Sequence, residues 1–252
     1  MNPAVLMPIY NTTAEQLRLC QQDLESVLSQ DIGPLDIFLV DDGSLPETGT
    51  REWLAGLGDQ VCGHTIHLHL EAANNGPLKA INSLLKSIFG PGSDCETVLA
   101  INSDVILPSN IYREMARWPE GIVSARVSYD LNFRRVEQAT LLSKEAVLSP
   151  VTLIRKSAYQ TLIDADGYFF DEQFFLYSSD NDLLYRMRLL GIKGAVLDIE
   201  HYHYESACHR LAKPEVASSI IDHAIKDAAY FVRKWGGPPR QETFNKPFGG
   251  CA

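Results

Sequence analysis

Residues 35–44, Leu-Asp-Ile-Phe-Leu-Val-Asp-Asp-Gly-Ser, form a short apolar run that ends in a polar turn. A similar run extends from Ala4 to Ile9 and ends at Asn-Thr-Thr. Both runs have the length and the flanking residues of buried strands. Between them, Thr12 and Glu15 form a candidate capping box, and leucine and valine then recur at helical spacing. A strand, a helix and a strand in this order predict parallel pairing in an α/β fold.

Further apolar runs continue this alternation along the chain. Strands are predicted at 98–101, 122–127, 151–154 and 195–199, and helices near 78–88, 109–118, 180–190 and 217–235. The sequence has no internal repeat, and Gly and Pro concentrate only from Gly236 onward. We therefore expect one Rossmann-like α/β domain over residues 1–236, with a mostly parallel sheet flanked by helices, and a C-terminal tail over residues 237–252.

The composition is that of a globular protein. The chain has 252 residues, of which 45% are hydrophobic, so it is long enough to bury a full core. A net charge of −10 argues against a surface that coats nucleic-acid phosphates non-specifically. Five widely spaced cysteines argue against a disulfide framework and a zinc site. No secretory signal and no run of about 18 apolar residues is visible, so we expect a cytoplasmic protein without a membrane-spanning segment.

Polar residues directly follow three of the predicted strands. Asn11 follows the first, Asp41-Asp42-Gly43-Ser44 the second and Asn102-Ser103-Asp104 a third. The carboxyl ends of parallel strands meet at one edge of a sheet, where α/β proteins bind ligands. A carboxylate there can accept the ring N–H of uracil, thymine or guanine, which makes Asp42 a candidate for reading a base. The same four residues are also ordinary turn formers.

Asp104 is a candidate ligand for a divalent cation. Mg²⁺ and Mn²⁺ are usually held by one or two carboxylates while substrate phosphates complete the shell. His201 and His203 alternate at the end of the last predicted strand, so both imidazoles face one side, and histidine is a common metal ligand. Each residue also has an ordinary alternative: a cap or turn for the aspartate and a structural role for the histidines.

Two further segments carry candidate chemistry. Gly76 and Pro77 stand at the start of a predicted helix, where free N–H groups suit an anion and Lys79 can reach a phosphate; a plain loop-to-helix junction has the same pattern. Residues 166–183 interleave aromatic residues with acids. Acids cap helices well and aromatic residues fill cores, but a carboxylate beside an aromatic surface is also a suitable general base, which makes Asp180 the candidate.

In this order, the motifs resemble those of family 2 glycosyltransferases of the GT-A fold, from about Val5 to Gly236. Residues 5–11 resemble the opening strand and residues 40–44 the nucleotide-binding turn, and residues 102–104 stand at the family's Asp-x-Asp metal motif. Residues 74–82 resemble the next helix start. Residues 167–186 are similar to the acceptor segment, Gly-x-Phe-Asp-Glu followed by Glu-Asp-x-Asp-Leu-x-x-Arg, and residues 230–236 resemble a C-terminal signature.

The resemblance implies a role for each matching residue. It implies that Asp180 is the catalytic base, that Asp42 contacts the base of the donor, and that Asp104 binds metal and diphosphate. His201 or His203 would complete the metal site, and Arg186 would brace the helix that carries Asp180. The remaining candidates for binding the donor are Pro8, Tyr10, Asn11, Asn75, Gly76, Lys79, Asn102 and Ser103.

Two positions depart from the family pattern. Asn102 replaces the first Asp of Asp-x-Asp, a variant that resembles the rhamnosyltransferase-like branch, and leaves Asp104 as the main acidic ligand. Ser179 replaces the Glu of the Glu-Asp pair, which removes an acidic neighbour that would support the proton affinity of Asp180.

The expected function is therefore an inverting, metal-assisted transfer of a sugar from a nucleoside diphosphate sugar, with UDP or dTDP favoured, to an acceptor hydroxyl. Mn²⁺ or Mg²⁺ is the expected cofactor, and the acceptor is a glycan, a lipid-linked sugar, a small molecule or a modified base. The two departures leave open a non-catalytic module that only binds sugar nucleotides. A nucleotidyltransferase ranks last, because the Gly-rich loop that such enzymes carry after the first strand is missing.

Overall fold

The central feature is a mixed sheet in the order β3-β4-β2-β1-β5-β9-β7-β10-β8. The computed structural model describes residues 2–125, 138–140, 150–197, 199, 201–204 and 210–238. The nine strands are β1 (Ala4–Ile9), β2 (Asp36–Asp41), β3 (Gln60–Val61), β4 (His64–Leu70), β5 (Thr97–Ile101), β7 (Ile122–Ala125), β8 (Gln138–Thr140), β9 (Val151–Arg155) and β10 (Gly194–Leu197). A separate two-stranded sheet pairs β6 (Val105–Ile106) with β11 (Tyr202–His203).

Most strands of the large sheet point the same way. Strands β1, β2, β4, β5, β7 and β10 are parallel to one another, whereas β3, β8 and β9 oppose them. The mostly parallel α/β sheet that the sequence predicts is therefore confirmed. All six predicted strands are present, with ends that differ by up to a few residues; residues 126, 127 and 198 lie outside the described residues.

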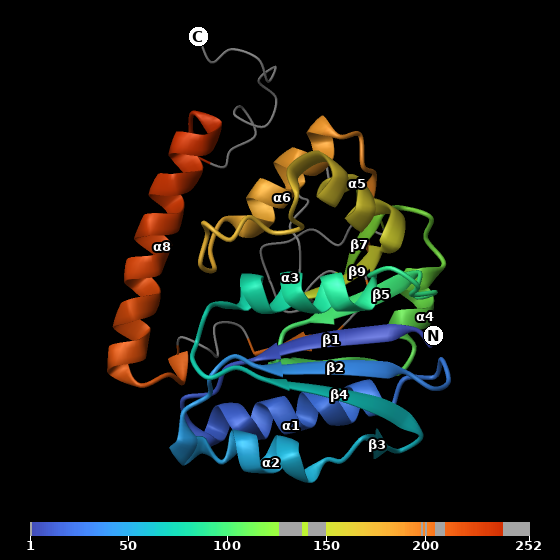
Figure 1. Cartoon of the computed structure of the whole chain (residues 1–252), viewed down its shortest axis with the longest axis vertical. Helices are drawn as coiled ribbons and strands as arrows, with labels where there is room; N and C mark the ends of the chain where they lie inside the picture. Colours follow the sequence, from blue (N-terminus) through green and yellow to red (C-terminus); the bar gives the residue numbers. More distant parts are fainter. Residues whose placement is uncertain are drawn as a thin grey trace.

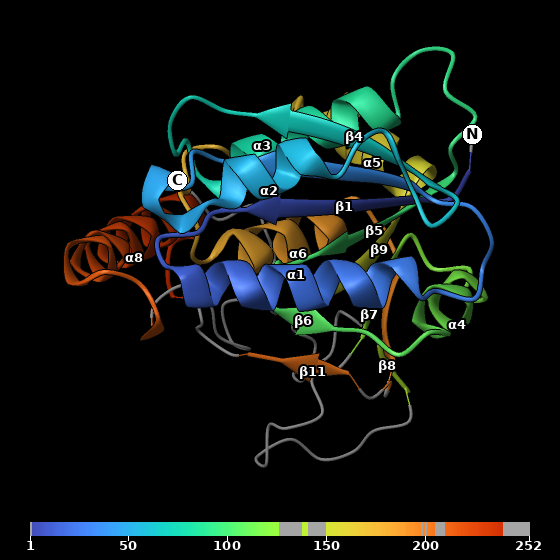
Figure 2. The ribbon, with the colours of Figure 1, turned by 90° about the horizontal axis from the view of Figure 1, so that it is seen from below.

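Helices cover both faces of the sheet (Figures 1 and 2). They are α1 (Ala14–Leu28), α2 (Thr50–Gly56), α3 (Pro77–Ile88), α4 (Ile111–Ala116), α5 (Lys156–Asp166), α6 (Ser179–Leu189) and α8 (Pro214–Trp235), with a 3-10 turn η1 (Pro46–Thr48). In the described part of the chain, no helix is both long and apolar enough to cross a membrane.

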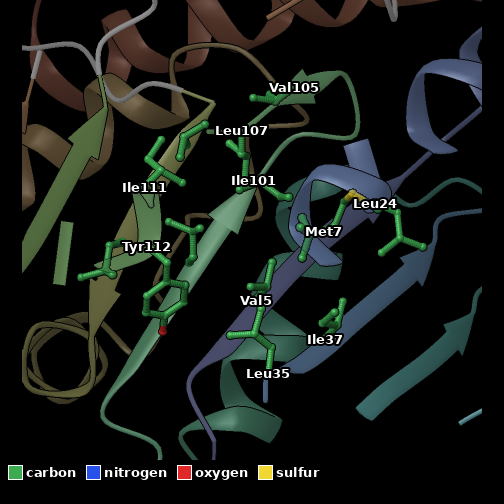
Figure 3. Close-up of a cluster of buried hydrophobic side chains, with 14 of the residues drawn as sticks. Val5, Met7, Leu24, Leu35, Ile37, Ile101, Val105, Leu107, Ile111 and Tyr112 are labelled. Carbon is green, nitrogen blue, oxygen red and sulfur yellow. The ribbon is translucent and has the colours of Figure 1, made fainter. Parts of the chain in front are cut away.

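Successive side chains of each strand point to opposite faces of the sheet, so a hydrophobic core forms on each face. Ala4 and Leu6 of β1 pack with side chains of α3, α5 and α6, whereas Val5, Met7 and Ile9 pack with side chains of α1 and α4. Figure 3 shows part of the second cluster, in which β1, β2 and β5 meet residues 105–112. A sheet buried on both faces explains why its strands read as continuous apolar runs.

The start of α1 differs from the prediction by one residue. Thr13 is the N-cap and forms a capping box with Gln16, so the predicted box at Thr12 and Glu15 is wrong. The buried Oε1 of Gln16 also accepts the backbone N–H of Thr12 at 2.7 Å. A neutral amide can be buried at this strand end, whereas the charged Glu15 stays in solvent.

Several described elements were not predicted, namely the helices α2 and α5, the turn η1, and the strands β3, β4, β6, β8 and β11. Strand β4 alternates histidine with leucine from residue 67 onward, and those residues are exposed, so its composition lacks the signature of a buried strand.

Helix α8 ends at Trp235, followed by Gly236 in the left-handed conformation. The domain boundary at residue 236 stays a prediction, and residues 239–252 of the predicted tail lie outside the described residues.

Candidate active site

The first two strand ends are tied together at the carboxyl edge of the sheet. Ile9 pairs with Asp41, and the backbone N–H of Asp42 donates to the carbonyl of Ile9 at 2.8 Å. Beyond the strands, the N–H of Asn11 donates to Oγ of Ser44 at 2.8 Å, and the buried Asn11 amide donates to Oγ1 of Thr50 at 3.2 Å. Asn11 thus fixes the turn, while Pro8 and Tyr10 remain partly exposed at the same edge.

The two aspartates of the Asp-Asp-Gly-Ser turn have different partners. Asp41 is fully buried, and its carboxylate accepts from Nε of Arg51 at 2.8 Å and from the N–H of Ser44 at 3.1 Å. Asp42 reaches across to the loop before α3, where its two oxygens accept the N–H groups of Asn75 and Gly76, each at 2.9 Å. Burial raises the pKa of Asp42 against the lowering effect of these two hydrogen bonds.

Gly43 and Gly76 allow the two loops to approach closely. A Cβ on Gly43 would lie 2.5 Å from the carbonyl carbon of Ala73, and φ is +76° there. Gly76 has a φ of +92°, and a Cβ on it would meet the ring of Phe175 at 3.1 Å. The turn formers in both motifs are therefore required by close backbone packing.

The first turn of α3 leaves exposed side chains beside this loop. Asn75 and Lys79 are exposed, and Gly76 is the N-cap with Pro77 in the first turn. The side chain of Asn75 donates to the carbonyl of Ala73 at 3.0 Å. The carboxylate of Asp42 already occupies the N–H groups of Asn75 and Gly76 at this helix start, and Lys79, in the first turn of α3, carries the exposed positive charge beside it.

Asp104 and His203 are about a hundred residues apart in the sequence but lie side by side at the small sheet of β6 and β11. His203 pairs with Val105 in the small sheet, and its Nε2 lies 3.2 Å from Oδ1 of Asp104. The side chains of His203 and Asp104 are 14% and 15% exposed. One carboxylate oxygen and one imidazole nitrogen fit a divalent cation whose remaining ligands come from substrate, as Mn²⁺ and Mg²⁺ sites require. Among the described residues, no cluster of three acids, histidines or cysteines could hold a metal alone.

The neighbours of this pair are placed differently. His201 is buried, its Nδ1 lies 3.1 Å from the carbonyl of Ile199, and burial lowers its pKa. Asn102 is exposed and Ser103 partly exposed directly after β5. His203, rather than His201, therefore faces Asp104.

Asp180 lies in the first turn of α6 and is partly buried. Its Oδ1 accepts from the side chain of Asn181 at 3.1 Å, and desolvation raises its pKa above the ordinary value of an aspartate. The helix is entered through Ser178, which has a φ of +60°, a left-handed conformation that is uncommon outside glycine. Strain of this kind clusters at functional sites.

Asp182, one residue beyond Asn181, has a structural role. It is fully buried and accepts from Nε of Arg186 and from Nε1 of Trp235, each at 2.9 Å. The Lys234 ammonium lies 2.7 Å from Asp182 and 2.6 Å from Asp171. Arg186 also forms an ion pair with Asp166 at the end of α5, at 3.1 Å, which ties the helix of Asp180 to α5.

Sequence reasoning missed two residues that organise this region. Asp227 of α8 is buried and accepts three backbone N–H groups of the loop before α6. Arg51 neutralises the buried Asp41. Asp227 stands in no motif, but it lies seven residues after Ile220 and four before Phe231, on one face of α8, and this helical spacing is the signal that could have indicated that it faces inward.

A match to a protein-family model identifies the family of this chain. The model described as "Glycosyl transferase family 2" matches residues 4–180, which include β1, the Asp42 turn, Asp104 and Asp180. The chain belongs to glycosyl transferase family 2. The matched range carries the sheet edge described above.

Solved structures with a similar fold include other transferases. A mannosyltransferase from Pyrobaculum calidifontis, in complex with GDP-Man and Mn²⁺, is 16% identical, with a TM-score of 0.64 over 96% of this chain and 68% of that chain. Glucosyl-3-phosphoglycerate synthase from Mycobacterium tuberculosis, with Mg²⁺ and UDP, is 17% identical, with a TM-score of 0.55 over 94% and 80%. S. aureus TarS is 21% identical, with a TM-score of 0.59 over 93% of this chain.

This chain spans 44% of the length of the TarS chain. No curated protein matches the sequence significantly. At these identities the structural matches establish the GT-A-like fold.

Proposed function

We propose that this member of the family is an inverting transferase that moves a sugar from a nucleoside diphosphate sugar to an acceptor hydroxyl, with Asp180 as the general base. The observation that carries the proposal is the setting of Asp180, a partly buried carboxylate with a raised pKa, held next to an aromatic loop. A raised pKa brings a carboxylate closer to the proton affinity that base catalysis near neutral pH requires.

The donor nucleotide is proposed to bind along the edge formed by β1, β2 and the start of α3. Asp42 holds the Asn75–Gly76 backbone, and the lone pairs that remain on its oxygens can accept a ring N–H of uracil, thymine or guanine. Pro8 and Tyr10 line the base side, and Asn11 fixes the turn beside it. The exposed Lys79 suits the diphosphate, and Asn102 and Ser103, which directly follow β5, are proposed to contact it as well.

Asp104 and His203 are proposed to hold Mn²⁺ or Mg²⁺. Such an ion, when bound, neutralises negative charge that develops on the departing diphosphate. The two solved structures that contain Mn²⁺ with GDP-Man and Mg²⁺ with UDP support this choice of ion and donor class. The single charge at Asp104, with Asn102 beside it, agrees with a site completed by substrate phosphates.

In the proposed reaction, Asp180 accepts the proton of the acceptor hydroxyl. The acceptor oxygen forms its bond to the anomeric carbon while the bond to the diphosphate oxygen breaks on the opposite face, so the configuration inverts. Among the aromatic side chains of residues 168–177, the exposed Tyr177 offers a stacking surface for a sugar ring, whereas Phe169 and Phe174 are buried in the core. UDP or dTDP as the nucleotide, a rhamnosyltransferase-like specificity and a cytoplasmic location remain proposals from the sequence.

The test is the Asp180→Asn variant, with Asp164→Asn, an exposed carboxylate on α5, as the control. Release of nucleoside diphosphate is followed across a panel of sugar nucleotides and acceptors. The proposal predicts that Asp180→Asn lowers transfer by roughly 10²–10⁴-fold while nucleotide binding is unchanged, and that the control stays active. Transfer near the wild-type rate in Asp180→Asn would remove the base assignment, and nucleotide binding without turnover by the wild type would favour a binding module.

A further inference from the structure

The loop that leads into α6 is held by a side chain from a distant helix. The backbone N–H groups of Phe175, Leu176 and Tyr177 all donate to the carboxylate of Asp227, at 2.9, 2.9 and 2.8 Å. Asp227 lies near the middle of α8 and is 2% exposed. A buried carboxylate that collects three main-chain donors forms strong, charge-assisted hydrogen bonds and fixes the path of the backbone that supplies them.

Side-chain packing fixes the same loop from two sides. The ring of Phe175 stacks on His223 of α8, with ring centroids 3.7 Å apart and planes 15° from parallel. The other neighbour of Phe175 is Gly76, which Asp42 holds through its N–H. The loop is therefore enclosed between α8 and the segment proposed to bind the donor.

Asp180 follows this loop after only two residues. Ser178 carries the left-handed φ of +60°, and Oγ of Ser179 donates back to the carbonyl of Leu176 at 2.9 Å. On the other side of Asp180, the buried Asp182 is bound by Trp235, again from α8. Helix α8 thus holds the chain both before and after Asp180. Figure 1 shows α8 running alongside the part of the fold that contains α6.

We propose that Asp227 is a positioning residue for the transfer reaction: its carboxylate fixes residues 175–177 and thereby aims Asp180 at the acceptor. This inference rests on the proposed function. In the described part of the chain, the hydrogen bonds of the Asp227 carboxylate go to backbone N–H groups, so its removal frees the loop without removing a side chain proposed to contact substrate. A displacement of the base by about 1 Å is enough to slow such a reaction by up to about a hundredfold.

The first measurement is amide hydrogen exchange and does not depend on activity. In the wild type, the amides of 175–177 are expected to exchange as slowly as those of α6, although they lie in a loop. In Asp227→Asn, which keeps the size of the side chain but loses its charge, exchange at these three positions should be at least about tenfold faster. Asp222→Asn, an exposed position on the same helix, should leave it unchanged.

The second measurement separates positioning from a general structural role. With a working donor and acceptor, Asp227→Asn should lower kcat at least about tenfold and leave the KM for the donor within about twofold, whereas Asp222→Asn should change neither. Rapid exchange of 175–177 in the wild type would overturn the proposal even if Asp227→Asn fails to fold. So would an Asp227→Asn enzyme with the kcat of the control. If no transfer is found with any variant, the proposed function fails, while the exchange data still decide whether Asp227 holds the loop.

Discussion

Asp23 and Asp42 are both buried carboxylates, but their hydrogen-bond partners differ. Asp42 accepts two main-chain N–H groups at 2.9 Å. Asp23 on α1 accepts one weak contact, from the N–H of Val105 at 3.5 Å, and within the described part of the chain its Oδ1 has no partner. Burial raises the pKa of Asp23 well above its ordinary value, and the charge of Asp104 adds to the effect. The carboxylate of Asp42 is therefore held by two hydrogen bonds, whereas burial of Asp23 disfavours its charged form with little compensation from hydrogen bonds.

We predict that Asp23→Asn stabilises the protein at neutral pH relative to the wild type. The folded state holds the Asp23 proton more tightly than the unfolded state, so wild-type stability falls as pH rises from about 4 towards the raised pKa, and the variant lacks this loss. The expected gain is roughly 1–3 kcal/mol at pH 7 and smaller at pH 5. Urea unfolding at both pH values measures it. Glu25→Gln, exposed on the same helix, is the control, and a gain that does not grow with pH would contradict the prediction.

The raised pKa of Asp180 predicts the pH profile of the reaction. A general base works in its deprotonated form, so kcat/KM should fall as pH decreases through the pKa of Asp180. Because desolvation raises that pKa, the acid limb should lie above the value of about 4 that is usual for aspartate. An acid limb at or below pH 4, or the same limb in the residual activity of Asp180→Asn, would show that another group is the base.

At the scale of elements, the end of α8 is joined to α6 and to the loop before it by one ammonium group. Lys234 donates to Asp171 and to Oη of Tyr168 and forms an ion pair with the fully buried Asp182. Burial opposes its charge, but the hydrogen bonds with Asp171 and Asp182 outweigh this effect and raise the pKa of Lys234. Burial and the same Asp171 raise the pKa of Tyr230 to about 12.

Replacing Lys234 by Met should therefore be strongly destabilising. The substitution leaves Asp171 without its cation and Asp182 with Arg186 as its remaining cation, and breaking a buried pair from one side costs about 3–5 kcal/mol. Lys226→Met, on the exposed side of α8, should cost less than about 0.5 kcal/mol. Denaturant unfolding compares the two variants, and equal stabilities would refute a role for Lys234 in attaching α8.

Which elements could be predicted from the sequence depends on how their apolar residues are distributed. Strands β1 and β2 are buried on both faces and read as continuous apolar runs, so they were predicted nearly to the residue. Strand β4 is exposed from His67 to Leu70, and this exposure hid it. The direction of β9 could not be predicted, because antiparallel insertion between β5 and β7 depends on pairing between segments far apart in sequence.

At the scale of the whole molecule, the candidate site depends on long-range contacts that no local pattern contains. The sequence indicated Asp104 and a histidine pair, but only the pairing of β6 with β11 selects His203 as the partner of Asp104. Similarly, Asp42 was predicted at the correct strand end, but its hold on Asn75 and Gly76 arises from packing across 33 and 34 residues of sequence. The order of the motifs therefore predicts which residues lie at the carboxyl edge of the sheet, whereas the contacts between their side chains depend on the tertiary structure.

This edge of the sheet is proposed to bind a nucleoside diphosphate together with a divalent cation at Asp104. Thermal unfolding with UDP, dTDP, GDP, ADP and CDP, each with and without Mn²⁺, tests it in the wild type and in Asp104→Asn, because a ligand that binds only the native state raises its stability. We predict a shift with UDP, dTDP or GDP that requires Mn²⁺ and is lost in Asp104→Asn. If millimolar nucleotide gives no shift, or if the shift is equal in the variant, this edge does not bind a nucleoside diphosphate through a cation at Asp104.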